Sequence, residues 1–182
     1  MKVLMISDVY YPRINGVSTS IATFRKALHT LGHQSVLLAP DYPGFSEPDE
    51  SIVRVPSLYL PLDPEDRIMR MRPLRRRMQA LASQQCDLLH IHTPFVAHRA
   101  GTRLARQLGV PAVETYHTFF EEYFHHYLSV LPRSWLRLAA REVSRRLERH
   151  LDGLIVPSSA IERALRGCRL RVPNGGAGAT LE

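Results

Sequence analysis

The sequence of 182 residues has only two lysines, two cysteines and one tryptophan, and no long apolar run. Cys86 and Cys168 lie far apart and lack metal-type spacing, so we interpret both as reduced thiols rather than a disulfide or a metal site. No apolar stretch approaches the roughly 20 residues of a membrane-spanning helix. The apolar residues 1–7 are too few for a signal peptide. These absences predict a cytoplasmic protein.

Three common motifs for nucleotides and metals are also missing. There is no GxGxxG turn, which argues against a Rossmann dinucleotide site, and no GxxxxGK[ST], which argues against a P-loop nucleotidase. Nine histidines are present, but none belongs to an HExxH or mixed His/Cys cluster. We expect His90 and His92, which alternate along a strand, to point to opposite sides. The sequence therefore predicts no metal site.

Basic residues are abundant, and they are almost all arginine. Lys2 and Lys26 are the only lysines, so the other 22 of the 24 basic residues are arginines, and the net charge is +7. This balance indicates anionic partners: nucleic acid, phosphate-bearing substrates or an anionic membrane surface. Nucleic-acid binding would require aromatic side chains among the basic ones. Only Trp135 lies within the arginine clusters, in an apolar row, so we predict no nucleic-acid partner.

Short apolar runs alternate with longer amphipathic stretches along the chain. The runs predict strands at residues 2–7, 35–39, 52–55, 87–91, 111–115, 153–156 and 169–172. The periodicity predicts helices at residues 17–31, 95–108, 119–129, 133–151 and 159–166, and one that starts near Pro73. Apolar strands separated by helices indicate a parallel sheet covered on both faces, so we predict an α/β, Rossmann-like doubly wound fold. Residues 40–50 and 56–66 are rich in proline and aspartate and are interpreted as loops.

Polar segments directly follow five of the predicted strands. They are residues 8–16, 92–94, 116–118, 157–159 and 173–175. Ligands of open parallel sheets bind beyond the carboxyl ends of the strands, so we expect a site at this edge. Turns also contain Pro, Gly, Ser and Thr for conformational reasons alone. That alternative explains residues 157–159 well and the histidines of the edge less well.

Gly16 and His117 are the candidates that position alone selects. A glycine at a helix N-terminus lets a phosphate approach the backbone N–H groups, although an ordinary helix-entry turn is the simpler explanation. His117 lies in a turn at the expected ligand edge, where an imidazole can hydrogen-bond a sugar hydroxyl or a developing charge. A purely structural histidine is the alternative, and position does not separate the two.

Taken together, a series of segments resembles glycosyltransferase family 4. They are residues 1–8, 11–17, 31–33, 87–94, 115–118, 156–158 and 172–175. Their order and spacing fit the family over nearly the whole chain. The bacterial members that the sequence most resembles transfer mannose or glucose to phosphatidylinositol, diacylglycerol or related acceptors.

The resemblance implies the N-terminal half of a GT-B fold. It implies a retaining transfer of a hexose from a nucleotide sugar, GDP-mannose or UDP-glucose, to a lipid or glycan acceptor, with no cofactor and no required metal. By the same resemblance, His117 is the catalytic residue near the reacting sugar and Gly16 contacts the donor diphosphate. Tyr10, Asn15 and Thr118 fall on the acceptor side.

The resemblance also divides the chain. Residues 1–172 correspond to an acceptor-side domain, and residues 173–182 to the start of an interdomain linker or an added tail. The family's second domain, which grips the nucleotide, does not follow Gly175, so we expect the chain to be inactive alone. The alternatives are a non-catalytic domain that binds sugar or phosphate, and another GT-B enzyme such as an epimerase or phosphorylase.

Two arginine clusters lie on predicted helices. In the first, Leu74 and Met78 form an apolar stripe from which neighbouring arginines point away. In the second, arginines recur every four residues along one row, opposite an apolar row. A solvated helix face is one interpretation. The resemblance favours docking at the inner face of the plasma membrane, where basic residues bind anionic headgroups. The residues that we predict for this contact are Arg75, Arg76, Arg77, Arg137, Arg141 and Arg145.

Overall fold

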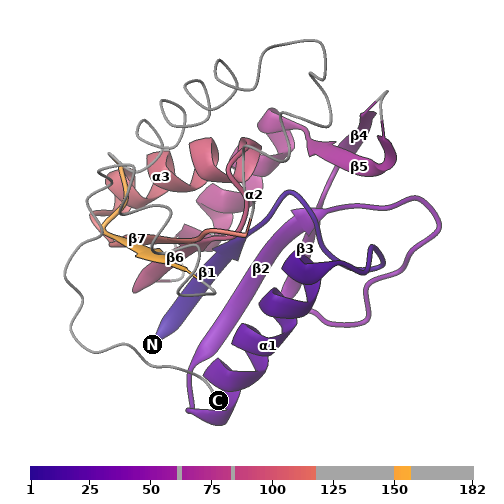
Figure 1. The fold of residues 1–182 in the computed structure, drawn as a ribbon. Coiled ribbons are helices and arrows are strands. Elements are labelled where there is room, and N and C mark those ends of the chain that lie inside the picture. The colour runs from indigo at the N-terminus through magenta and orange to yellow at the C-terminus, as the bar shows by residue number, and fades with distance from the viewer. Residues whose placement is uncertain (61–62, 83–84, 118–149, 157–182) are drawn as a thin grey trace, which may run out of the picture.

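The computed structural model describes residues 1–60, 63–82, 85–117 and 150–156 (Figure 1). Its centre is a parallel sheet of six strands in the order β3-β2-β1-β6-β7-β8. The strands are β1 (Lys2–Ile6), β2 (Gln34–Pro40), β3 (Ile52–Val55), β6 (Leu88–Ile91), β7 (Ala112–Thr115) and β8 (Gly153–Ile155). Six predicted strands are thus confirmed to within one or two residues. The predicted strand at residues 169–172 lies outside the described residues.

Three helices connect the described strands. They are α1 (Gly16–Thr30), α2 (Met71–Ala82) and α3 (Val96–Leu108). Helix α1 starts after Asn15, whose side chain accepts a hydrogen bond from the Ser18 N–H at 2.8 Å, and α3 ends at Gly109 in the left-handed conformation, as N-cap asparagines and C-terminal glycines do. The predicted helices at residues 119–129, 133–151 and 159–166 fall mainly or entirely outside the described residues.

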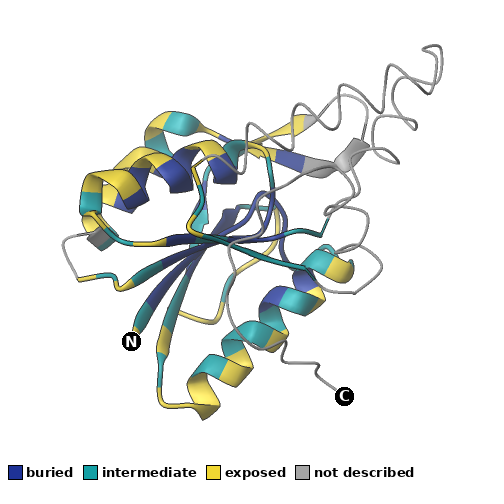
Figure 2. Ribbon diagram, turned by 60° about the vertical axis from the view of Figure 1, so that its left-hand side comes forward, coloured by how far each residue is buried: buried dark blue, intermediate teal, exposed yellow. Residues whose placement is uncertain are grey.

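The sheet has a helical layer on each face (Figure 1). Alternate residues of each strand point to opposite sides, so Leu4 and Ile6 pack with α2 and α3, whereas Val3 and Met5 pack with α1. Figure 2 shows buried residues concentrated on the central strands and exposed residues on the outer sides of the helices. The described part of the chain is therefore the doubly wound α/β fold that the sequence predicts.

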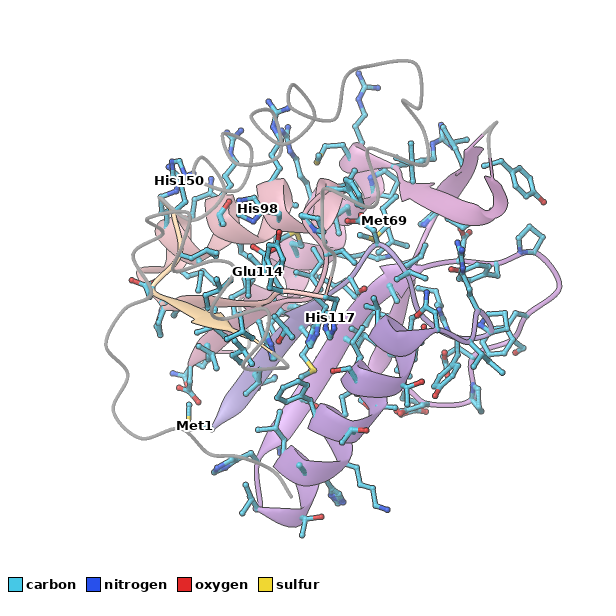
Figure 3. The ribbon with its side chains drawn as sticks, viewed as in Figure 1. Met1, Met69, His98, Glu114, His117 and His150 are labelled. Carbon is cyan, nitrogen blue, oxygen red and sulfur yellow. The ribbon has the colours of Figure 1, made fainter. Side chains whose placement is uncertain are left out.

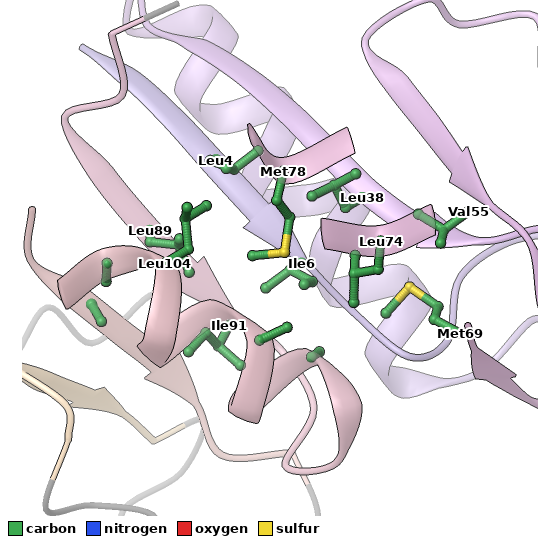
Figure 4. Close-up of a cluster of buried hydrophobic side chains, with 14 residues drawn as sticks. Leu4, Ile6, Leu38, Val55, Met69, Leu74, Met78, Leu89, Ile91 and Leu104 are labelled. Atoms are coloured by element: carbon green, nitrogen blue, oxygen red, sulfur yellow. The ribbon is translucent and has the colours of Figure 1, made fainter. Parts of the chain in front are cut away.

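The larger apolar cluster lies between the sheet and helices α2 and α3 (Figure 4). Leu89 and Ile91 of β6 are fully buried in it, as is Leu74 of α2. Gly101 of α3 packs directly onto this strand, because a Cβ added there would lie 2.9 Å from side-chain atoms of both Leu89 and Ile91. The glycine therefore sets how closely α3 approaches the sheet.

One predicted loop is wrong. Residues 56–66, interpreted as a loop, contain β4 (Ser57–Leu60) and the start of β5 (Asp63–Met69), which pair antiparallel as a separate two-stranded sheet. Arg67 of β5 is buried there, with its guanidinium 4.1 Å from the ring centroid of Tyr59 and its Nε donating to the Ser57 hydroxyl at 2.9 Å. Proline and aspartate lower strand propensity locally, but cross-strand contacts override that preference.

Candidate functional site

The strand order reverses between β1 and β6, which are neighbours in the sheet. The chain leaves β1 toward α1 on one face and leaves β6 toward α3 on the other. The two connections therefore diverge at the carboxyl-terminal edge. In open α/β sheets the crevice at such a switch point is where ligands bind.

Asp8 ties these two connections together. Its backbone N–H donates to the Thr93 hydroxyl at 2.7 Å, and that hydroxyl donates to the Asp8 carboxylate at 2.8 Å. The Ala97 N–H donates to the same carboxylate at 3.0 Å. Phe95, at the N-cap of α3, makes no side-chain capping bond. Asp8 therefore caps α3 from the turn after β1 and fixes that turn to the turn after β6.

Burial raises the pKa of Asp8 to about 6, and the nearby Glu114 carboxyl adds to the increase. Hydrogen bonds from Ala97 and Thr93 act in the opposite direction without overcoming burial. Sequence reasoning included Asp8 only as the start of a turn. The bond to α3 joins residues 89 positions apart, and no local pattern signals it.

Three imidazoles lie next to one another beside the same edge, on the α1 face, and we call His90, His92 and His117 the histidine column (Figure 3 labels His117). The centroids of the His90 and His92 rings are 4.0 Å apart, and those of His92 and His117 are 5.7 Å apart. Phe24 of α1 packs edge-on against His90 at 5.1 Å. The prediction that His90 and His92 point to opposite sides is wrong, because residues two apart on a strand share a face.

The column is linked by polar contacts and is held neutral. His90 Nε2 lies 2.7 Å from the Thr115 hydroxyl, and His92 Nδ1 lies 3.4 Å from His117 Nε2. Burial lowers the pKa of His90 and of His117 to about 4, and lowers the pKa of His92 well below its ordinary value. Above about pH 5, the column can therefore donate and accept hydrogen bonds without carrying charge.

A second buried pair lies on the opposite face of the sheet. His98 Nδ1 of α3 is 2.6 Å from the Glu114 carboxylate of β7, and both side chains are buried (Figure 3). Burial raises the pKa of Glu114, and the bond to His98 partly offsets this. The pair joins α3 to β7, so we assign it a structural role. The sequence offered no sign of it.

Gly16, predicted at the donor diphosphate, is the first residue of α1 and is exposed. A Cβ added there would meet no atom within 4 Å. The fold therefore does not require glycine at this position, unlike at Gly101. The space beside Gly16 is thus open, and its contact with a donor diphosphate stays a prediction.

The residues predicted on the acceptor side have different environments. Asn15 caps α1 through its side-chain oxygen. Tyr10 is buried, with its ring 4.9 Å from that of Tyr11 and 5.6 Å from the Arg54 guanidinium. Thr118 lies outside the described residues. Asn15 and Tyr10 thus shape the turn after β1, and their contact with an acceptor stays a prediction.

Of the predicted membrane contacts, Arg75, Arg76 and Arg77 are exposed on α2, while Leu74 and Met78 are buried as the periodicity predicts. Arg75 also lines a groove of about 180 Å³ between α2 and α3, together with other polar and apolar side chains. The remaining lining residues are Met71, Met78, Gln79, Arg99, Ala100, Arg103, Leu104 and Gln107. Arg137, Arg141 and Arg145 lie outside the described residues.

The described residues contain neither a cluster of metal ligands nor a membrane-spanning helix. No group of three or more His, Cys, Asp or Glu side chains in residues 1–60, 63–82, 85–117 and 150–156 could hold a metal ion. In the same segments, no helix is long and apolar enough to cross a membrane. The expected independence from metals and cofactors stays a prediction.

Comparison with known proteins places this geometry in a family. Residues 14–175 match the family model of Glycosyltransferase Family 4. The chain is 28% identical over 174 residues to an alpha-monoglucosyldiacylglycerol synthase of Streptococcus pneumoniae, covering 94% of this chain and 38% of that protein. It is 29% identical over 156 residues to a GDP-mannose-dependent alpha-mannosyltransferase of Corynebacterium glutamicum. That match covers 81% of this chain and 37% of the mannosyltransferase.

A solved structure supports the fold independently of sequence identity. Anabaena HepE in complex with UDP superposes with a TM-score of 0.60 at 15% identity, covering 94% of this chain and 42% of that one. This chain thus spans about two fifths of the length of the proteins that it matches. The overlap corresponds to one Rossmann-like half of a GT-B fold, as predicted. Since the family model covers most of its length, the chain belongs to glycosyltransferase family 4.

Proposed function

We propose that this chain is the acceptor-side domain of a retaining hexosyltransferase, which transfers mannose or glucose from a nucleotide sugar to a lipid or glycan acceptor. The relatives' names support both sugars, since one is a glucosyldiacylglycerol synthase and another is GDP-mannose-dependent. Structures of the related fold contain UDP and UDP-glucose. Because the chain covers about two fifths of these proteins, the activity is proposed for a longer parent protein, and we expect the chain alone to be inactive.

The observation that carries the proposal is the open N-terminus of α1 at the same sheet edge as the histidine column. Asn15 satisfies the N–H of Ser18, and the N–H groups of Gly16 and Val17 have no partner within the helix. Those two N–H groups and the positive end of the helix dipole suit a donor diphosphate. His117, half-buried and neutral, suits a hydrogen bond to the transferred sugar.

The decisive experiment assays the parent protein with GDP-mannose and UDP-glucose and with lipid and glycan acceptors. We expect transfer with the donor's anomeric configuration kept, read by NMR of the product, and no transfer by residues 1–182 alone. In the parent, His117→Ala should lower kcat about 100-fold or more, as loss of one preorganised donor does. The control is His29→Ala, at an exposed histidine of α1. Equal activity of both variants would overturn the assignment of His117.

We further propose that the exposed arginines of α2 hold the parent at the cytoplasmic face of the membrane. Arg75, Arg76 and Arg77 present three adjacent positive charges, each contributing about 1 kcal/mol near an anionic surface. The triple change to glutamate should abolish co-sedimentation with anionic vesicles at low salt. Lys26→Glu, on exposed α1, is the control. Equal sedimentation of the unchanged protein with neutral and anionic vesicles would contradict docking.

A further inference from the structure

The contact between His92 and His117 constrains where their protons lie. His92 Nδ1 and His117 Nε2 are 3.4 Å apart, at the long end of the hydrogen-bond range, with ring planes 22° apart. A neutral imidazole carries one N–H and one bare nitrogen. A hydrogen bond between the two facing nitrogens requires that exactly one of them carries the proton, and the choice for one ring then decides the tautomer of the other.

The second nitrogen of His92 decides between the two arrangements. His92 is fully buried, and its Nε2 has no hydrogen-bond partner among the described residues. If His117 were the donor, the remaining proton of His92 would be on Nε2, leaving a buried N–H unpaired. Such orphan donors are rare and costly, and an unfilled acceptor is tolerated more often. The favoured arrangement has the proton on His92 Nδ1 and a bare Nε2.

The surroundings of His92 hold its ring in this orientation. The His90 ring packs at 4.0 Å on one side, and the Phe24 ring lies at 5.8 Å. His90 is itself fixed by its contact with the Thr115 hydroxyl. A ring flip would require these packed side chains to move, so the orientation of His92 is preorganised.

We propose that His92 is a positioning residue that fixes His117 as its Nδ1–H tautomer. His92 Nδ1–H donates to His117 Nε2, so the proton of His117 is on Nδ1, the opposite of the preference of a free neutral imidazole. His117 then offers a ligand one hydrogen-bond donor and no basic nitrogen. It can bind a hydroxyl or phosphoryl oxygen but cannot accept a proton from it. That the ligand is a sugar or its phosphate rests on the proposed function; the tautomer does not.

Nuclear magnetic resonance of the chain with ¹⁵N-labelled histidine tests the proposal at neutral pH. Long-range ¹H–¹⁵N spectra distinguish the protonated from the bare ring nitrogen, and a His117→Gln variant assigns the His117 signals. We expect His117 and His92 to be Nδ1–H, and the exposed His29 to show the ordinary mixture dominated by Nε2–H. An Nε2–H tautomer for His117 in the unchanged chain would overturn the proposal.

Two substitutions separate positioning from packing. His92→Phe keeps an aromatic ring in the column but removes the donor, so His117 should revert to Nε2–H. His92→Asn places an amide N–H near the original Nδ1 and should keep His117 as Nδ1–H. Reversion in both variants, or in neither, would contradict the proposal. If His92→Phe does not fold, the unchanged chain and His92→Asn still decide it.

The outcome is independent of enzymatic activity. An Nδ1–H tautomer in a protein whose parent transfers no sugar would leave the positioning role intact and remove the proposed function. An active parent whose His117 is Nε2–H would leave the proposed function intact and overturn the positioning role.

Discussion

The two faces of the sheet are built from neighbouring residues of the same strands and differ in kind. On the side of α2 and α3, fourteen buried apolar residues form one continuous cluster. On the side of α1 the apolar cluster has seven buried residues, and toward the carboxyl edge it gives way to the histidine column. Strand β6 shows the contrast within four residues, since Leu89 and Ile91 point to the apolar face and His90 to the polar one.

The difference indicates that the two faces have different roles, one in packing and one in presenting polar groups. The α2/α3 face supplies most of the packing, and the carboxyl end of the α1 face holds polar groups that packing alone does not require. Asp8 lies where the two meet, since it belongs to the turn before α1 and caps α3. Three predictions test this comparison.

The largest effect is expected from Leu89→Ala. Leu89 is fully buried in the α2/α3 cluster, and removing such a side chain leaves a cavity that lowers the free energy of unfolding by about 2–5 kcal/mol. The matched control is Leu88→Ala, the adjacent half-buried residue that packs with the α1 side, for which we expect a clearly smaller loss. Urea unfolding measures both. Equal losses of unfolding free energy in the two variants would contradict the claim that the α2/α3 face supplies most of the packing.

The second prediction concerns pH, because the histidine column on the α1 face and Asp8, where the two faces meet, titrate in opposite directions. The pKa of His90 and His117 falls from 6.5 to about 4 on folding, so the unfolded chain binds their protons first and stability is lost as pH falls from 6.5 to 4. The pKa of Asp8 rises from 3.8 to about 6, so its contribution is lost as pH rises from 4 to 6.

Replacing the titrating Asp8 carboxyl by an amide should therefore steepen the pH dependence of the free energy of unfolding. In Asp8→Asn the opposing contribution disappears, and the free energy of unfolding should increase by about 2 kcal/mol more between pH 4 and pH 6 than in the unchanged chain, since one pKa unit corresponds to about 1.4 kcal/mol and part of the titration lies outside this range. Chemical unfolding at pH 4, 5 and 6 measures the slopes. Parallel curves would mean that Asp8 titrates as it does in the unfolded chain.

The smallest expected effects come from two glycines at helices on opposite faces. Gly101→Ala should destabilise the fold by about 1–3 kcal/mol, because its Cβ would lie 2.9 Å from side-chain atoms of Leu89 and Ile91. Gly16→Ala meets no atom within 4 Å, so stability should stay unchanged or rise by up to about 1 kcal/mol. In the proposed parent glycosyltransferase, the same change should weaken nucleotide-sugar binding. Thermal unfolding of both variants checks the pair, and a large loss at Gly16 would contradict its assignment to the ligand.

Much of the fold could be predicted because its signals are local. Apolar runs such as residues 2–7 and 87–91 identify strands of a covered parallel sheet by composition alone, and the apolar periodicity of residues 17–31 identifies a helix, observed as Gly16–Thr30. The antiparallel pair β4 and β5 was missed because its stability depends on contacts such as that of Arg67 with Tyr59, which join residues that the local pattern treats as loop.

The sequence by itself determined the α/β class and the family, and it proposed the sheet edge of the candidate site and Gly16 and His117 as candidate residues. Each depends on short-range order: the side-chain period of a strand, the turn after it, and motifs in a fixed succession. Only the tertiary structure decided that Asp8 caps α3, that His98 pairs with Glu114, and that the rings of His92 and His117 are in contact. Those contacts join separate strands and helices in three dimensions, and the distance between two such side chains is set by how the sheet and helices pack.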